Sequence, residues 1–160
     1  MLHVICLGNL WQGDNGFGIH VLGRLRERPG LPPQVKLFDA GIAGLAAVGY
    51  FEHCSKAVIV DALVSGGRIG RVHRLRVDDL VPPAREVSLH AFGLSHLLTA
   101  LPVVFRGQPM PEIVLIGAEI DEIRRFTDEL TPPLRAAIDT AVRLVCREIT
   151  GHAPGRLTPP

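Results

Sequence analysis

The stretch LHVICLGNLWQGDNGFGIHVL, residues 2–22, runs from an apolar segment through a glycine-rich loop into a helical pattern. Residues 2–8 form a short, β-branched apolar run that ends in glycine, which predicts a buried strand. Residues 17–28 place apolar side chains on one helical face, namely Phe17, Val21, Leu22 and Leu25. The stretch therefore predicts a strand, a glycine-rich turn and a helix in succession.

Strands and helices continue to alternate along the rest of the chain. The sequence predicts further strands at 34–41, 56–63 and 111–120 (ending near Gly117), a half-exposed edge strand at 69–77, and helices at 42–54, 92–101 and 132–149. Thr131 is the expected N-cap of the last helix. Such alternation predicts an α/β fold: a three-layer sandwich with a mostly parallel, twisted sheet flanked by helices, of the phosphorylase/hydrolase-like kind. We expect one domain over residues 1–150 and a disordered tail at 151–160.

Composition narrows the function classes. Hydrophobic residues make up 47% of the 160 residues, which suits a sheet covered on both faces. The net charge of +1 gives no electrostatic reason to expect nucleic acid or an anionic membrane as partner. No apolar run approaches the roughly 18 residues that span a bilayer, and we identify no signal peptide. The three separate cysteines predict buried, reduced thiols and hence a cytoplasmic protein.

The glycine-rich loop does not match the common phosphate-binding motifs. A dinucleotide fingerprint needs G-x-G-x-x-G, whereas Asn9 directly follows Gly8, and a P-loop needs a lysine that the loop lacks. The loop instead carries the side-chain oxygens of Asn9, Asp14 and Asn15. These residues could be structural, with Asp14 or Asn15 capping the helix that starts near Gly16 and Asn9 locking its own turn.

Two other predicted strands carry an aspartate near their carboxyl ends. Asp39 and Asp61 lie at the carboxyl ends of their strands, where open α/β sheets bind ligands. Closely spaced carboxylates repel one another unless they share a cation or a proton. His90 precedes the helix predicted at 92–101, and oxygen ligands together with an imidazole suit a divalent transition metal. A lone loop histidine is, however, more often structural or solvated than a ligand.

Six segments follow one another in a recognisable order: LGNLWQGDNGFG at 7–18, FDAGIAGL at 38–45, AVIVDAL at 57–63, SLHAFGLSHLL at 88–98, IVLIGAEI at 113–120 and LTPPLRAAI at 130–138. In these segments, and over residues 2 to about 148, the chain resembles the hydrogenase maturation endopeptidases, which trim the large subunit of nickel–iron hydrogenases. The resemblance implies a substrate that is a large-subunit precursor already carrying nickel, from which a C-terminal extension is removed.

The resemblance also implies the site residues. Carried over by position, the family's metal contacts fall on Asn15, Asp61 and His90. The family usually has Asp or Glu where this chain has Asn15, so either the amide is a tolerated ligand, or Asp14 substitutes for it, or this member is impaired in catalysis. Nickel would arrive with the substrate, and no tightly bound cofactor of the protein itself is expected.

The sequence lacks the Gly-x-Ser-x-Gly, catalytic-cysteine and His-Glu-x-x-His signatures of other hydrolases. We therefore expect Asp61 or Asp14 to be the base that activates water, with Asp39 and Asn9 supporting the metal contacts. Two other functions remain open. One is a non-catalytic relative that binds the large subunit or its nickel as an assembly factor or chaperone. The other is an α/β ligand-binding domain without protease activity.

Overall fold

The structure, a computed structural model, describes residues 1–64, 67–77, 92–121, 123 and 126–151. Within these residues the core of the fold is a five-stranded sheet in the order β2-β1-β3-β5-β4. Its strands are β1 (Leu2–Leu7), β2 (Val35–Gly41), β3 (Lys56–Val64), β4 (Val72–Arg76) and β5 (Glu112–Ile120). All neighbouring pairs are parallel except β4 and β5. The mostly parallel sheet and the edge position of the strand predicted at 69–77 are confirmed.

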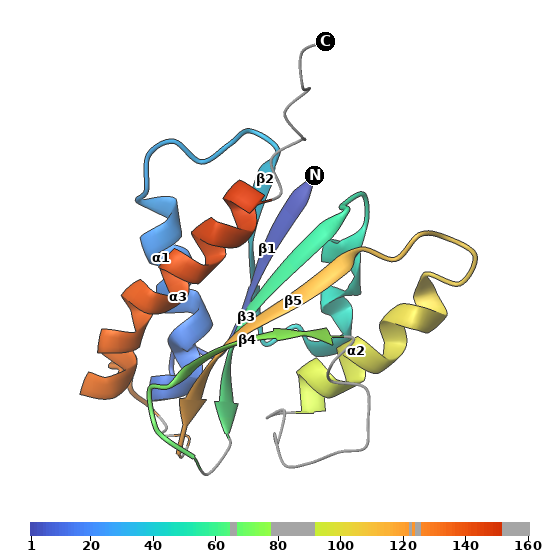
Figure 1. Cartoon of the computed structure of the whole chain (residues 1–160). Coiled ribbons are helices and arrows are strands. Elements are labelled where there is room, and N and C mark those ends of the chain that lie inside the picture. The colour runs from blue at the N-terminus through green and yellow to red at the C-terminus, as the bar shows by residue number, and fades with distance from the viewer. Residues whose placement is uncertain (65–66, 78–91, 122, 124–125, 152–160) are drawn as a thin grey trace.

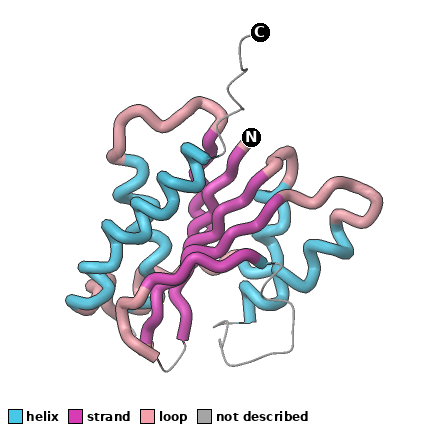
Figure 2. Tube along the Cα trace, viewed as in Figure 1, coloured by secondary structure: helices cyan, strands magenta, loops and turns pink. Residues whose placement is uncertain are grey.

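Helices cover both faces of this sheet, as Figures 1 and 2 show. One face carries α1 (Phe17–Arg26) and α3 (Pro132–Gly151). The opposite face carries the 3-10 helix η2 (Gly44–Phe51) and α2 (Phe92–Val104). The three-layer sandwich is therefore confirmed. No helix in the described part of the chain is both long and apolar enough to cross a membrane.

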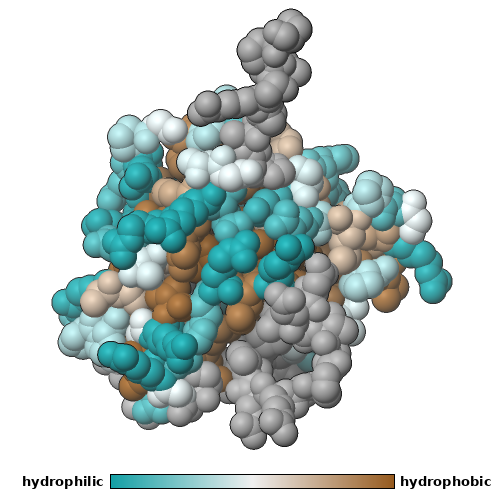
Figure 3. Space-filling model, in the orientation of Figure 1, coloured by the Kyte–Doolittle hydropathy of each residue, from teal (hydrophilic) through white to brown (hydrophobic). Residues whose placement is uncertain are grey.

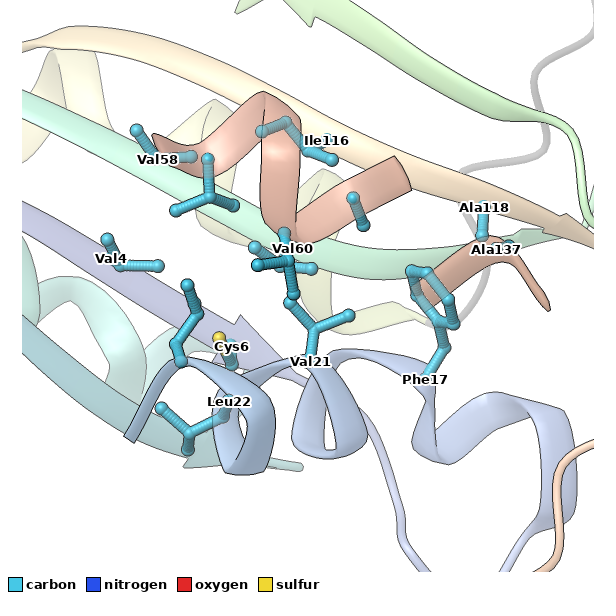
Figure 4. Packing of buried hydrophobic residues seen from close by; sticks show 14 of the residues in the cluster. Val4, Cys6, Phe17, Val21, Leu22, Val58, Val60, Ile116, Ala118 and Ala137 are labelled. Carbon is cyan, nitrogen blue, oxygen red and sulfur yellow. The ribbon is translucent and has the colours of Figure 1, made fainter. Parts of the chain in front are cut away.

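Each face of the sheet has its own apolar core. Even-numbered side chains of the central strands, such as Val58 and Val60, pack with Phe17 and Val21 of α1 and with α3 (Figure 4). Odd-numbered side chains, such as Ile59 and Leu63, pack with η2 and α2. This alternation follows from the two-residue period of a strand. It also determines the face of the sheet on which each polar strand residue lies.

Two glycines of the loop after β1 allow the chain to pack closely at the carboxyl edge of the sheet. A Cβ atom at Gly18 would overlap the carbonyl oxygens of Leu7 and Val60. Gly8 has a φ of +136°, and a Cβ there would overlap the carbonyl oxygen of Asn15. Gly18 therefore lets the first turn of α1 pack against β1 and β3, and Gly8 lets the end of β1 pack against the backbone at Asn15. These close contacts explain the two glycines without a phosphate ligand.

Several boundaries differ from the sequence predictions. The helix predicted at 42–54 is the 3-10 helix η2, because Gly44 has a left-handed φ of +52° and Gly49 also disfavours an α-helix. β5 does not end near Gly117, because it pairs with β3 as far as Val64 and Ile120. The three cysteines are free, but only Cys6 is fully buried. The tail beyond Gly151 lies outside the described residues.

A charged cluster joins α3 to the sheet at the amino edge. Glu148 of α3 is 8% exposed, and its carboxylate lies 2.6 Å from both Lys56 Nζ of β3 and Arg74 Nε of β4. Lys56 is equally buried, at 7% exposure, and Glu112 lies 3.5 Å from its Nζ. The arginine hydrogen bonds, followed by those of Lys56, outweigh desolvation and lower the pKa of Glu148.

Candidate functional site

The loops after β1 and β2 meet at the carboxyl edge of the sheet. The amide of Gly8 donates to the carbonyl of Gly41 at 2.9 Å, which ties the end of β1 to the end of β2. The chain then turns through a short 3-10 helix, η1 (Gly13–Gly16), before α1 begins. Asn15 lies in this helix, and its backbone N–H donates to the backbone carbonyl of Gln12 at 3.2 Å. The predicted ligand Asn15 is thus held on a tightly bonded turn next to β3.

Asp61 lies on β3 at the level where β1 ends, because β1 pairs with β3 only as far as Cys6 and Val60. Its side chain belongs to the sheet face of η2 and α2, and the residue is 6% exposed. Burial raises the pKa of Asp61 to about 7, although its own Oδ1 accepts a hydrogen bond from the Ala62 amide at 2.8 Å, which acts in the opposite direction. A carboxyl group with this pKa can both take and release a proton near neutral pH.

The side chain of Asn15 is oriented by a residue that the sequence did not single out. Asn15 Nδ2 donates to Gln12 Oε1 at 2.9 Å. With its nitrogen engaged as a donor, Oδ1 is the atom of the Asn15 side chain that can accept a hydrogen bond or bind a cation. Gln12 lies three residues before Asn15, which places the two on one side of the turn. That spacing was the only sequence signal for this contact, and it is a weak one.

Asp14 points to a different part of the fold. Its two carboxylate oxygens accept hydrogen bonds from Thr131, from the backbone amide at 2.6 Å and from Oγ1 at 2.8 Å, and Asp14 is 4% exposed. The Thr131 carbonyl accepts from Arg135 N at 2.9 Å, as an N-cap carbonyl does. Asp14 therefore anchors the start of α3. The capping of α1 by Asp14 or Asn15 was a wrong hypothesis, because the N-cap, Gly16, has no side-chain cap.

Replacing Asp14 by Ala is expected to destabilise the protein by roughly 2–4 kcal/mol, because two hydrogen bonds to a buried carboxylate are lost. For a chain of this size the change lowers Tm by roughly 5–15 °C in thermal unfolding. Thr131→Val removes only the hydroxyl donor and should cost less than half as much. An Asp14→Ala protein with an unchanged Tm would contradict this structural role of Asp14.

Asp39 and Asn9 each hold their own loop. Asp39 Oδ1 accepts from Gly41 N at 3.1 Å, and the alternation along β2 puts Asp39 on the face of Leu37, which packs with the α1 and α3 core. Asp39 and Asp61 are thus on opposite faces of the sheet. Asn9 Oδ1 accepts from Trp11 N at 3.0 Å, so the prediction that Asn9 locks its own turn is confirmed.

His90, the third predicted metal contact, lies outside the described residues, so its approach to Asn15 and Asp61 stays a prediction. In the described ranges, no group of three or more His, Cys, Asp or Glu side chains is placed to hold a metal ion.

A histidine–carboxylate pair lies on the same sheet face as Asp61. His73 of β4 pairs in register with Gly117 of β5, which in turn pairs with Asp61. His73 Nε2 lies 2.6 Å from Glu119 Oε1, and the Glu119 side chain is 9% exposed. The sequence analysis missed this pair, because the two residues are 46 positions apart and meet only through the register of β5 with β4.

Comparison with known proteins agrees with the resemblance found in the sequence. The family model described as hydrogenase maturation protease matches residues 19–148. The hydrogenase expression/formation protein HupD of Bradyrhizobium diazoefficiens is 31% identical over 147 residues, which cover 90% of this chain and 75% of that protein. The hydrogenase 2 maturation protease of Escherichia coli is 28% identical over 144 residues, covering 89% and 86% of the two chains.

Solved structures show the same fold. The hydrogenase maturating endopeptidase HybD from Escherichia coli superposes with a TM-score of 0.80 and 26% identity, over 95% of this chain and 93% of that chain. The maturation protease HybD from Thermococcus kodakarensis, at 18% identity, shares the fold with a TM-score of 0.73, over 92% of this chain and 98% of that chain. This chain belongs to the hydrogenase maturation protease family.

Proposed function

We propose that this protein is an endopeptidase that removes the C-terminal extension of a nickel-loaded precursor of a nickel–iron hydrogenase large subunit. The observation that carries the proposal is Asp61, a buried carboxyl group with a pKa raised to about 7, at the carboxyl edge of the sheet and on the strand that the turn of Asn15 contacts. In a protein of this family, a carboxyl group in this position is a candidate for the base that peptide hydrolysis needs.

Nickel is part of the substrate in this proposal. Asn15 Oδ1, the Asp61 carboxylate and the His90 imidazole would bind the nickel that the precursor presents, since oxygen and imidazole donors both suit divalent nickel. Because the pKa of Asp61 is about 7, metal binding would displace its proton at neutral pH. Recognition of the metal would restrict cleavage to precursors in which nickel insertion is complete.

Hydrolysis then requires a base and a proton donor. A water oxygen forms a bond to the scissile carbonyl carbon, the carbon–nitrogen bond breaks, and the leaving amine gains a proton. We assign to Asp61 the role of taking the proton from the water and passing it to the amine, because its carboxylate is buried at the carboxyl edge of the sheet. The two carboxylate oxygens of Asp14 are already bonded to Thr131, which makes Asp14 the weaker choice.

Asn15 favours one alternative function. A neutral amide binds a metal ion more weakly than a carboxylate and cannot act as a base. A protein with this substitution could bind the large subunit or its nickel as an assembly factor without cutting it. Incubation of the purified protein with candidate precursors, followed by intact-mass spectrometry, separates the two functions. Endopeptidase activity gives a shortened large subunit and a released extension, whereas an assembly factor co-purifies with a precursor of unchanged mass.

Asn15→Asp is expected to tighten the binding of nickel or cadmium by roughly tenfold or more, because a charged oxygen replaces an amide dipole at nearly unchanged shape. Isothermal titration calorimetry with the free ion measures this effect. Asp139→Asn, at an acid of α3 whose side chain is 68% exposed, is the control and should leave metal affinity unchanged. If wild type and Asn15→Asp bound the metal ion with equal affinity, Asn15 would not be a metal ligand.

A further inference from the structure

Large apolar side chains are exposed on three segments near the candidate site: the loop after β1, the loop after β2 with the start of η2, and the segment before α3. Trp11 is 65% exposed in the loop after β1, and Ile42 and Leu45 are 78% and 56% exposed after β2. Phe126, in the segment before α3, is 94% exposed. We call these four residues the apolar rim. Single exposed apolar residues are ordinary, but a group of them on neighbouring loops marks an interaction surface.

Backbone hydrogen bonds join the three loops that carry the rim. Gly8 N donates to Gly41 O, one residue before Ile42, at 2.9 Å. The amide of Thr127, next to Phe126, donates to the Trp11 carbonyl at 3.3 Å, and the Thr127 carbonyl accepts from Gly13 N at 2.8 Å. The loops of the rim are therefore part of one bonded arrangement at the edge of the sheet.

The exposure of the rim is built into the backbone. The Asn9 side chain fixes the amide of Trp11, while the indole stays exposed. Phe126 has a φ of +61°, a conformation that is costly for a large side chain. A bonded backbone that holds large apolar groups in water, partly at the cost of strain, indicates a surface prepared for a partner.

We propose that the apolar rim is the docking surface for an extended, apolar segment of the large-subunit precursor, next to the bond that is cut. This inference rests on the proposed function and names how the same site holds its substrate. Asn15 lies on the same loop as Trp11, and Asp61 is only 6% exposed. Backbone hydrogen bonds from Asn15 to Gln12 and from Gly13 to Thr127 connect this turn to the rim. Contact with the rim would exclude water and hold the scissile bond in place.

The fold offers a matched control at its opposite edge. Val103, Val104 and Met110 are 72%, 48% and 43% exposed where α2 ends and before β5 begins. Figure 3 shows apolar surface on this projecting segment, which lies beyond α2 in Figure 1. Because β5 starts here, these side chains lie at the amino edge of the sheet, away from Asp61. They have similar chemistry and exposure but no continuity with the site.

Trp11 provides a direct probe, because it is the only tryptophan of the chain. Protein labelled with 5-fluorotryptophan gives one fluorine NMR signal, and unlabelled nickel-loaded precursor adds none. Docking on the rim is expected to shift this signal and to protect it from a soluble paramagnetic quencher. A signal that precursor leaves unchanged would overturn the proposal. A shift that depends on the concentration of the protein alone would also overturn it, since the rim would then join two copies of this chain.

Kinetics provides the second test. The double variant Ile42→Ser/Leu45→Ser should raise KM for the precursor by roughly tenfold or more and change kcat by less than about threefold. Val103→Ser/Val104→Ser should leave both constants unchanged. Equal KM values for the two variants, each with a wild-type Tm, would contradict the proposal. A shifted fluorine signal without any cleavage would support the rim and refute the endopeptidase function, so the two failures are distinguishable.

Discussion

Asp61→Asn is expected to end cleavage of the precursor while making the folded protein more stable at pH 8. Cleavage is lost because an amide cannot accept the proton of the attacking water or neutralise a metal ion. We expect a fall in rate of at least about a thousandfold, at the level that loss of a general base together with electrostatic stabilisation produces. Cleavage at close to the wild-type rate would remove Asp61 from the chemistry.

The gain in stability follows from the pKa of Asp61, which is raised from 3.8 to about 7 by burial. Between these values the folded protein retains a proton that the unfolded chain releases. The free energy of unfolding therefore falls as pH rises through this window, by roughly 4 kcal/mol for a shift of this size, and the loss is complete above pH 7. The amide that replaces the carboxyl group in Asp61→Asn does not ionise, so the variant should not lose this stability.

Urea unfolding at pH 5 and pH 8 measures the difference. Asp139→Asn is the control, because the Asp139 side chain is 68% exposed in its ion pair with Arg24, and it should follow wild type at both pH values. If the free energy of unfolding fell between pH 5 and pH 8 by the same amount in Asp61→Asn as in wild type, Asp61 would not be the cause of the fall. Ionisation of Asp61 would then cost the folded protein nothing.

Glu148→Ala is expected to destabilise the protein by about 3–5 kcal/mol, because it leaves the buried Lys56 ammonium without its partner at 2.6 Å. Arg74 loses the same partner but is 39% exposed and can reach water. Glu112→Ala removes a half-exposed carboxylate 3.5 Å from Lys56 and should cost less than about 1 kcal/mol. Urea unfolding at neutral pH measures both variants.

The charge cluster also has a defined pH dependence. The pKa of Glu148 is lower in the folded protein than in the unfolded chain. The contribution of Glu148 to the free energy of unfolding is therefore fully present above its unfolded-state pKa and is lost as the pH falls through its folded-state pKa. The double variant Lys56→Met/Glu148→Leu replaces charges by apolar groups and should recover most of the stability lost in Glu148→Ala. A double variant as unstable as Glu148→Ala would indicate that packing around Glu148, rather than an uncompensated charge, causes the loss.

The sequence predicted the layers of the fold because the buried strands are continuous apolar runs. The edge strand was recognisable because its basic and apolar residues alternate. η2 was predicted as an α-helix, since the left-handed φ of Gly44 is not visible in a periodic pattern. The extent of β5 depends on its pairing with β3 beyond the end of β1, and pairing is a property of the whole sheet.

For the candidate site, the rule that parallel strands present ligands at their carboxyl ends pointed to Asp39 and Asp61. The resemblance to the family, and not this rule, singled out Asn15 as a metal contact. The partner of Asp14 is Thr131, 117 residues away, and only the folded chain brings the two together. Asp39 looked equivalent to Asp61 because both follow apolar runs, yet the alternation on β2 puts it on the other face. The His73–Glu119 pair needed the register of the sheet.

The most direct test of the account compares two forms of one precursor. The purified protein is incubated with nickel-loaded and with nickel-free large subunit, and intact mass is followed over time. The account predicts loss of the C-terminal extension from the nickel-loaded form alone, and no loss from either form with Asp61→Asn. Equal cleavage of the nickel-free precursor by the wild-type protein would contradict the recognition of substrate nickel.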